Sequence, residues 1–537
     1  MELERLSPVG NQLLSDFWAG SERLLSFYQY PYNDDSFRIR AGYLKEQQYD
    51  RKGLSNVIYQ FMEPFGISQK SMEHLNKLEN GALAVVGGQQ AGLLTGPLYS
   101  VYKAISVILL AREQSEKLGI DVVPIFWIAG EDHDILEINH TFTIAEGVPK
   151  KRIYGTAPRH KTIASETRFD HAEMKAFIDE IFKDYGETEH TRGIYQSVLH
   201  HMNESETFTD FFSRLLNELF QEEGLLMIDS AFPPFRHYQS AFFQQIIQKN
   251  EAISAAVVEK ERLFDKNGYG TPISAAEENA NLFYVKDGER FLLERKNGDF
   301  VNLAANVKFT EDELLQLAER SPEKLSNNVV TRPLMQEMCL PVLAFVAGPG
   351  ELQYWATLKD AFEILNLQMP ILAPRLNITL VTRQAEQLLS EYDLTFEDVV
   401  NGQVEKIKQQ FIESIQDAEA KNKIDHIRKM LEAEYEDLSR YLDSKQIHLE
   451  KILEKNKQYH FMQLDYLNKK VEQEVLLKHE HTIRRLNTIT SELYPNDNWQ
   501  ERVYNPYQYL NIYGQSLISD LLKLPLKISN SHYLVKF

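Results

Sequence analysis

One stretch, from Gly81 to His140, constrains the fold more than any other part of this chain. A short apolar run ends in a glycine-rich loop, and Pro97 then opens a predicted helix. A second apolar run, from Val122 to Ile128, ends abruptly in acidic residues. This order of strand, loop, helix and strand is typical of a parallel α/β sheet, which needs crossover helices. Because open sheets of this kind bind ligands at the carboxyl ends of their strands, the stretch also predicts where a site lies.

Three later apolar runs are predicted to complete the sheet, and they cover residues 224–230, 340–346 and 370–373. Together these runs predict an α/β fold with a Rossmann-like parallel-sheet core and two inserted connecting segments. In the second insertion, Asp287-Gly288 separates two short apolar runs and predicts a β-hairpin.

A long region without helix breakers follows the core. From Pro374 to Pro495 there is no proline between the two ends, and Gly402 is the only glycine. Apolar residues recur there at steps of three, four and seven, which is the coiled-coil pattern. We expect a long α-helical arm that folds back on itself as a hairpin. Because its apolar stripe is narrow and needs a partner helix, a homodimer is the first interpretation and a purely intramolecular helix pair is the alternative.

After the arm, an aromatic and turn-rich segment is expected to return to the core. The predicted parts are 1–80, an N-terminal helical and aromatic segment that packs on the core; 81–385, the core with insertions at about 141–223 and 255–335; 386–494, the coiled-coil arm; and 495–537, the C-terminal return.

Composition excludes several classes of protein. Lys and Arg number 58 against 78 Asp and Glu, and a net charge of −20 argues against a nucleic-acid-binding surface. No stretch reaches about 18 apolar residues and no signal-peptide pattern is present, so we expect no membrane span and a cytoplasmic location. The single cysteine, Cys339, allows no internal disulfide, and its apolar surroundings favour a buried structural role over a nucleophile. The common nucleotide, zinc and serine-hydrolase motifs are also missing.

Polar residues gather just after the predicted strands. The loop from Gly87 to Pro97 is a candidate anion cradle, because the helix after it is predicted to offer free N–H groups. The second strand is followed by three carboxylates around one imidazole, a set that could bind an ammonium group, hold Mg²⁺ or transfer protons. A tight structural turn, solvated charge at a strand end and surface salt bridges are the alternatives. The candidate catalytic residues are Glu131, Asp132, His133 and Asp134; the candidate substrate-binding residues are Gln89, Gln90, Thr95, Gly96, Asn139, His140, Arg332, Gly348, Gly350, Tyr354 and Arg375; no resident metal site is predicted.

Three longer motifs, GGQQAGLLTGPLYSVYKA, PIFWIAGEDHD with EINH, and AGPGELQYWA, resemble those of the bacterial bacillithiol biosynthesis cysteine-adding enzymes. The resemblance covers essentially the whole chain. It implies a core similar to class I nucleotidyltransferases and aminoacyl-tRNA synthetases, and a dimer made through the coiled coil. It also implies a ligase that condenses the carboxyl of L-cysteine with the amine of glucosaminyl-malate, the last step of the pathway.

The same resemblance implies an ATP-type ligase with a nucleotide pocket outside the central cleft. We therefore expect ATP or ADP and Mg²⁺ as dissociable ligands, with no tightly bound cofactor. For that pocket the candidates are Trp499 and Tyr504, which could stack on adenine, and Arg502, which could meet phosphate. Packing of the C-terminal return is the alternative interpretation of these three residues.

The mechanism expected from the sequence uses the acidic cluster to orient the substrate amine and take its proton. The loop from Gln89 to Gly96 and the arginines Arg332 and Arg375 are expected to hold malate carboxylates or a phosphate. Neither H-x-G-H nor a K-M-S-K-S-like loop is present, so the activation of the cysteine carboxyl stays open. Two competing hypotheses are a synthetase-like enzyme for a different amino acid and a coiled-coil scaffold.

Overall fold

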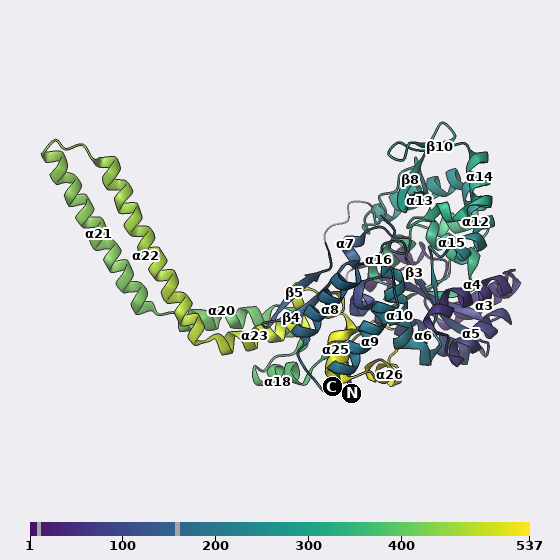
Figure 1. Cartoon of the computed structure of the whole chain (residues 1–537), viewed down its shortest axis with the longest axis horizontal. Coiled ribbons are helices and arrows are strands. Elements are labelled where there is room, and N and C mark those ends of the chain that lie inside the picture. Colours follow the sequence, from purple (N-terminus) through teal and green to yellow (C-terminus); the bar gives the residue numbers. More distant parts are fainter. Residues whose placement is uncertain (8–11, 156–161) are drawn as a thin grey trace. The chain divides into compact units, whose positions relative to one another are not determined.

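A computed structural model describes residues 1–7, 12–155 and 162–537. It divides into two compact units, each described here by itself (Figure 1). The first unit contains residues 1–145, 149–380 and 499–537, and the second contains residues 146–148 and 381–498. Within the described residues, none of the helices has both the length and the apolarity that a membrane crossing needs.

A five-stranded, all-parallel sheet forms the centre of the first unit, in the order β13-β12-β2-β3-β6. Its strands are β2 Leu83–Gln89, β3 Val122–Ile128, β6 Leu226–Asp229, β12 Val342–Ala347 and β13 Ile371–Pro374. Each strand arises from one of the predicted apolar runs, and almost all of their residues are buried. The predicted α/β fold with a Rossmann-like parallel-sheet core is therefore confirmed.

The strand order reverses beside β2. From β2 the chain proceeds to β3 and β6 on one side, whereas β12 and β13 lie on the other. Gly87 of β2 pairs in parallel with Val346 of β12, so the loops that follow these two strands begin side by side. Such a reversal opens a crevice at the carboxyl end of the sheet, where ligands bind in open α/β folds.

Helices from the N-terminal half cover the sheet. Helix α6 packs against β2, β3 and β12, helix α3 against β12 and β13, and helix α4 against β6. The aromatic residues Phe27, Tyr28 and Tyr30 are buried, so this cluster packs into the core. The helices of this part are α1 Gln12–Trp18, α2 Glu22–Leu25, α3 Asp34–Glu46, α4 Arg51–Met62, α5 Gln69–Glu79 and α6 Leu98–Leu118.

The first insertion lies between β3 and β6 and is mostly helical. Its elements are α7 Ile135–Ile138, β4 His140–Ala145, β5 Val148–Ile153, α8 His171–Tyr185, α9 Thr191–Asn203 and α10 Phe208–Phe220.

The second insertion lies between β6 and β12 and carries an antiparallel sheet in the order β10-β9-β8-β7-β11. Asp287 and Gly288 join β7 to β8 with φ values of 52° and 77°, the positive values of the predicted tight hairpin turn. The elements are α11 Pro233–Tyr238, α12 Ser240–Gln248, α13 Asn250–Lys266, β7 Asn279–Lys286, β8 Glu289–Lys296, β9 Asp299–Asn302, β10 Val307–Phe309, α14 Glu311–Arg320, β11 Leu325–Asn327 and α15 Thr331–Cys339.

The two ends of the chain meet in a small sheet in the order β1-β15-β14. Between β12 and this sheet, α16 and α17 follow the carboxyl end of the central sheet, and three short helices return the C-terminal segment to the first unit. The elements are β1 Glu2–Leu6, α16 Pro349–Trp355, α17 Lys359–Ile364, β14 Asn377–Val381, α24 Gln500–Val503, α25 Pro506–Tyr513, α26 Leu517–Lys523 and β15 His532–Lys536.

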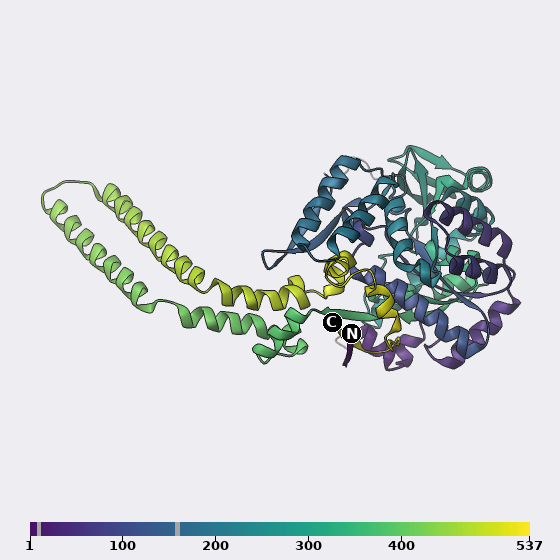
Figure 2. The ribbon, with the colours of Figure 1, turned by 60° about the horizontal axis from the view of Figure 1, so that its bottom comes forward.

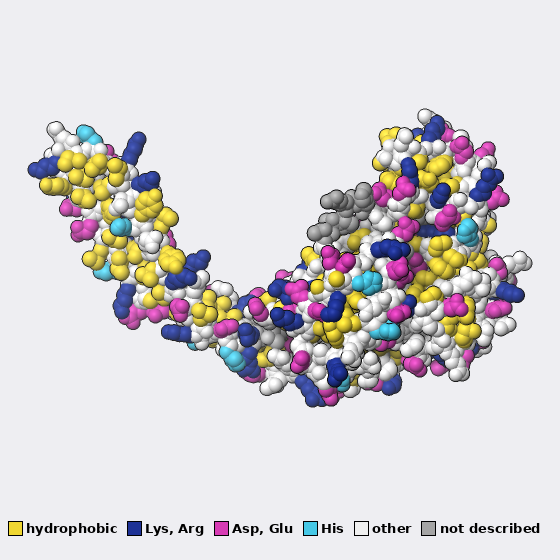
Figure 3. Space-filling model, viewed as in Figure 1, with side chains coloured by type: hydrophobic (Ala, Val, Ile, Leu, Met, Phe, Trp, Pro, Cys, Tyr) yellow, Lys and Arg dark blue, Asp and Glu magenta, His cyan; other side chains and the backbone are white. Residues whose placement is uncertain are grey.

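The second unit is built mainly from helices. Helices α21 and α22 run antiparallel and pack on each other, and α20 packs on α23, which gives the predicted folded-back hairpin (Figure 2). Apolar side chains gather along this arm (Figure 3). Its helices are α18 Arg383–Glu391, α19 Phe396–Val400, α20 Gln403–Ile415, α21 Ala418–Ser444, α22 Glu450–Lys478 and α23 Glu480–Leu493.

Candidate active site

A cavity of about 520 Å³ lies at the carboxyl ends of β2 and β12, where the strand order reverses. The residues of the sequence prediction that line it are Gln89, Gln90, Asp132, Arg332, Gly348, Gly350, Tyr354, Arg375 and Arg502. The other lining residues are Gly88, Tyr99, Lys103, Trp127, Ala129, Pro349 and Glu351. The tertiary structure thus brings together segments that lie as much as 400 residues apart.

The end of β2 approaches its neighbour closely, which requires glycine. A Cβ atom on Gly88 would lie 2.6 Å from the carbonyl oxygen of Trp127, which no side chain tolerates without a shift of the strand. This close approach lets the backbone at the end of β2 form part of the cavity wall. It is a physical reason for the glycine pair that the sequence shows at this point.

The helix after this loop does not offer the free anion site that the sequence predicts. The N–H of Leu98, the first residue of α6, donates to the carbonyl oxygen of Tyr504 at 2.7 Å. Thr95 is buried, and its hydroxyl donates to the carbonyl oxygen of Leu94. The C-terminal return therefore occupies part of the helix N-terminus, a long-range contact that no local pattern indicates.

Lys103 is the most buried cation in the cavity wall, with a side chain that is 2% exposed. Its Nζ donates to the carbonyl oxygen of Gly88 at 2.8 Å, to Oε1 of Gln89 at 3.0 Å and to Oε2 of Glu351 at 2.5 Å. Burial lowers the pKa of Lys103, and the neighbouring Glu351 carboxylate opposes that effect. Lys103 thus ties the end of β2 to the start of α16.

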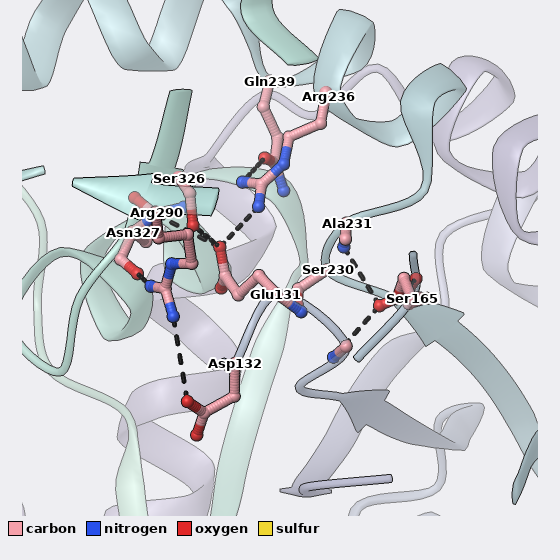
Figure 4. Close-up of polar contacts among 12 residues, drawn as sticks. Glu131, Asp132, Ser165, Ser230, Ala231, Arg236, Gln239, Arg290, Ser326 and Asn327 are labelled. Atoms are coloured by element: carbon pink, nitrogen blue, oxygen red, sulfur yellow. Dashed lines mark hydrogen bonds and ion pairs between the residues drawn. The ribbon is translucent and has the colours of Figure 1, made fainter. Parts of the chain in front are cut away.

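Asp132 is the member of the predicted catalytic cluster that lines the cavity. Its Oδ2 accepts from Nε2 of Gln90 at 2.7 Å, and its Oδ1 accepts from the backbone N–H of His133 at 2.7 Å. Arg290 lies 3.8 Å from the same Oδ1 (Figure 4). Both carboxylate oxygens are thus held in place.

Glu131 points away from Asp132 (Figure 4), and its side chain is buried. Its carboxylate pairs with Arg236, and it accepts from the hydroxyl of Ser326 at 2.7 Å and from the N–H of Asn327 at 3.1 Å. Burial alone would raise the pKa of Glu131, but the charges of Arg236 and Arg290 outweigh it and hold the pKa below its usual value. This geometry assigns Glu131 a structural role rather than the catalytic one that the sequence suggests.

The other two members of the cluster differ from each other: Nδ1 of His133 lies 3.4 Å from Nη1 of Arg290, the guanidinium that also approaches Asp132. The ring of His133 packs edge-on against Phe283, 5.9 Å between centroids, and Asp134 is exposed before α7. Among the described residues, no group of three or more His, Cys, Asp or Glu side chains is arranged to hold a metal ion. The expected convergence of three carboxylates on one imidazole therefore does not occur, because consecutive residues in this turn point in different directions.

Four cations and two carboxylates line the cavity. Lys103 pairs with Glu351, and Arg375 pairs with Glu501 at 2.6 Å in a fully buried contact. Burial would lower the pKa of Arg375, but the Glu501 carboxylate raises it above its usual value.

The other two cavity cations are Arg332 and Arg502, and neither forms an ion pair with a described residue. Arg332 instead donates to the hydroxyl of Tyr354 at 2.5 Å. The cavity therefore carries a positive surplus that suits an anionic ligand.

The remaining predicted residues lie beside this cavity or away from it. Gly96 and His140 line a small adjoining cavity of about 40 Å³, which shares Gln89, Gln90 and Arg502 with the larger one. Burial lowers the pKa of His140, so its imidazole is neutral at pH 7. Asn139 is buried and donates to the carbonyl oxygen of Tyr154 at 3.1 Å.

The residues predicted to stack on a nucleotide are engaged in packing. Tyr504 is fully buried, and the ring of Trp499 lies 4.8 Å from that of His532. Of these three candidates, Arg502 alone lines the cavities described above. The alternative interpretation, that these residues pack the C-terminal return onto the core, therefore applies to Trp499 and Tyr504.

Comparisons with known proteins agree with this architecture. The family described as "Bacillithiol biosynthesis BshC, N-terminal Rossmann-like domain" matches residues 1–376, and "Bacillithiol biosynthesis BshC, C-terminal coiled-coil domain" matches residues 378–537. The chain belongs to the BshC family. Curated relatives named "Putative cysteine ligase BshC" include proteins of Lysinibacillus sphaericus, 54% identical over all of both chains, Bacillus velezensis, 39% identical over all of both chains, and Geobacillus kaustophilus, 38% identical over 98% of each chain.

Sequence reasoning missed three charged residues of this BshC site. Lys103 had a usable signal, because it is the single charge in an otherwise apolar stretch of α6 from Leu98 to Ala111. Glu351 lies in the motif AGPGELQYWA, but nothing local connects it to Lys103, 248 residues away. Arg290 lies in the second insertion, and only the fold brings it to Asp132.

Proposed function

We propose that this chain joins L-cysteine to glucosaminyl-malate through an amide bond between the cysteine carboxyl and the glucosamine amine. The observation that carries the proposal is a cationic cavity at the switch point of the sheet in a chain of the BshC family. The relatives named as cysteine ligases support the choice of amino acid. A scaffold role is not favoured, since the curated relatives are named as ligases.

Recognition of the malate part follows from the charge balance of the cavity. Malate carries two carboxylates, and Arg332 is a guanidinium group of the cavity that no carboxylate of the described chain neutralises. Guanidinium groups bind carboxylates through two parallel hydrogen bonds, which fixes orientation as well as charge. Tyr354 holds Arg332 through its hydroxyl oxygen and so limits the positions that this guanidinium samples.

An amide cannot form from a free carboxylate without activation, so the reaction needs a co-substrate. A nucleoside triphosphate of the ATP type, with Mg²⁺, is the co-substrate in this proposal, and the intermediate is a mixed anhydride of cysteine and a phosphate. Arg502, which lines both cavities, is the residue best placed to meet a phosphate group. The aromatic rings of Trp127 and Tyr99 line the same cavity and would cover one side of such an anhydride.

Mass spectrometry tests this proposal directly. The purified protein is incubated with cysteine, glucosaminyl-malate and Mg²⁺, with and without ATP. The expected result is the cysteinyl amide only when ATP is present, with one AMP or ADP for each amide. Absence of the amide in both reactions, from protein that binds neither cysteine nor glucosaminyl-malate, would overturn the proposal.

A matched pair of variants tests the malate contact. Arg332→Gln is expected to raise KM for glucosaminyl-malate by about 10- to 100-fold, the value of a charged hydrogen bond, and to leave KM for cysteine unchanged. Arg38→Gln is the control, because Arg38 is 65% exposed and lies on helix α3. Equal KM values for glucosaminyl-malate in the two variants would show that Arg332 does not bind malate.

We also propose that the protein is a cytoplasmic homodimer formed through the arm. On α22, Tyr459, Met462 and Tyr466 follow a spacing of three and four, and each is more than half exposed. Exposed apolar residues at this spacing are typical of a coiled-coil seam that a second chain covers. The double variant Met462→Glu with Tyr466→Glu is expected to be a monomer, as measured by light scattering. The control variant Lys455→Glu, at an exposed residue of the same helix, is expected to remain a dimer. A wild-type protein that is monomeric at micromolar concentration would refute this assembly.

A further inference from the structure

The cavity contains two carboxylates, Asp132 and Glu351, and they differ in what remains open to a ligand. An amine that attacks a carbonyl must first lose the proton that makes it an ammonium group. The group that takes this proton needs an acceptor oxygen that faces the ligand and is not already saturated by protein donors. The hydrogen bonds of the two carboxylates therefore decide between them.

Both carboxylate oxygens of Asp132 already accept hydrogen bonds from the protein. Gln90 donates to one oxygen, and the backbone N–H of His133 donates to the other. Arg290 adds a positive charge 3.8 Å away. These contacts orient the turn that follows β3 and leave Asp132 poorly suited to take another proton.

Glu351 is held through one oxygen only. Its Oε2 accepts from Nζ of Lys103 at 2.5 Å and from the N–H of Gly348 at 2.7 Å. No described residue donates to Oε1, and the side chain lines the cavity with 22% of its surface exposed. The carboxylate is thus fixed at one end and open to the cavity at the other.

The donor that fixes Glu351 has no capacity left for a ligand. An ammonium group has three N–H bonds, and Lys103 directs them to Gly88, Gln89 and Glu351. Lys103 is therefore a positioning residue, which sets the direction of the carboxylate relative to the end of β2. Its burial excludes water that would otherwise compete for Oε2.

We propose that Glu351 is the catalytic base of the ligase, which holds the ammonium group of glucosaminyl-malate and takes its proton. This inference rests on the proposed function. Oε1 accepts one proton from the ammonium group and releases it to solvent, which frees the nitrogen lone pair. That lone pair forms the C–N bond at the carbonyl carbon of the cysteinyl phosphate anhydride, and the C–O bond to phosphate breaks with its electron pair on the phosphate. The second proton then leaves the nitrogen for the same carboxylate.

A binding experiment tests the ammonium contact without any turnover. Calorimetry compares wild type, Glu351→Gln and the exposed control Glu363→Gln, with glucosaminyl-malate and with malate alone as ligands. Glu351→Gln is expected to weaken the binding of glucosaminyl-malate by about 10- to 100-fold, which is the effect of losing a charged hydrogen bond. The affinity for malate alone is expected to change less than about twofold. Equal effects on the two ligands, or no effect on either, would overturn the inference.

Kinetics tests the proton transfer. Glu351→Gln is expected to lower kcat by about 10²- to 10⁴-fold and to remove the acid limb from the pH dependence of kcat/KM. If this variant is unstable, Glu351→Asp keeps the charge beside Lys103 but withdraws the oxygen, and a similar loss of kcat is expected. A Glu351→Gln enzyme with wild-type kcat and pH profile would show that another group is the base.

The two experiments separate this inference from the proposed function. If the wild-type protein binds glucosaminyl-malate but needs a different acyl donor, only the proposed function is contradicted. The binding comparison would still decide the role of Glu351. Lys103→Met is expected to lower kcat more than it raises KM, and Lys103→Arg is expected to restore part of kcat. Wild-type kinetics in Lys103→Met would remove its positioning role.

Discussion

Replacement of Arg236 by Met is expected to destabilise the scaffold beneath the candidate active site. Arg236 and Glu131 form an ion pair whose side chains are 2% and 5% exposed. The loss of one partner from such a pair leaves an uncompensated buried charge and costs about 3 to 5 kcal/mol. Ser326 and Asn327 still donate to Glu131, and the charge of Arg290 remains nearby, so the lower end of this range, about 3 kcal/mol, applies.

Thermal unfolding measures this loss. At about 2.1 cal/mol/K per residue, a cooperative unit of about 400 residues has an unfolding entropy near 0.8 kcal/mol/K. A loss of about 3 kcal/mol then lowers Tm by about 4 °C. Glu131→Gln combined with Arg236→Met is expected to recover about half of the loss, because the unpaired charge is gone.

The pH dependence of this difference has a defined sign. In the wild type the pKa of Glu131 lies below its usual value, so its contribution is present near neutrality and is lost as the pH falls below about 4. Without Arg236, the effect of burial on the pKa of Glu131 is less strongly opposed, so protonation of Glu131 stabilises the variant at a higher pH than in the wild type. The difference in Tm between the wild type and Arg236→Met is therefore largest at pH 7 and becomes smaller at acid pH. An equal Tm for variant and wild type at pH 7, or a double variant as unstable as the sum of the two single ones, would refute the reasoning.

Three further predictions concern other residues of the same unit. Burial raises the pKa of Asp229 to about 6, so the wild type is expected to lose up to about 3 kcal/mol relative to Asp229→Asn as the pH rises from about 4 to 6; parallel Tm curves for the two proteins would contradict this. Gly88→Ala is expected to lower the free energy of unfolding by about 1 to 3 kcal/mol in urea titrations and to abolish ligation, whereas Gly42→Ala, where an added Cβ meets nothing within 4 Å, is tolerated; equal midpoints would show that β2 can shift. Burial raises the pKa of the Cys339 thiol, so iodoacetamide is expected to label it only after unfolding, and rapid native labelling would reopen its role as a nucleophile.

Most of the fold could be predicted from the sequence, because the patterns that indicate it are local. Each buried parallel strand needs a continuous apolar run, and each helical arm needs a repeat near 3.5 residues, so both can be recognised within a short window. The same holds for the hairpin at Asp287-Gly288, where two positive φ values favour those residue types. The location of the cavity at strand ends also followed, since parallel strands carry their carboxyl ends to one edge of the sheet.

The tertiary structure decided which polar residues work together. In the turn after β3, neighbouring side chains point in different directions, so Glu131 faces Arg236 in the interior while Asp132 faces the cavity. Lys103 and Glu351 meet only because α6 and α16 pack on adjacent strands, β2 and β12. Charge pairing over hundreds of residues leaves no periodic trace in a sequence, because it depends on strand order and register rather than on local spacing. The sequence therefore determined the sheet and the edge where the site lies, and only the packed chain determined which carboxylate is left open to a ligand.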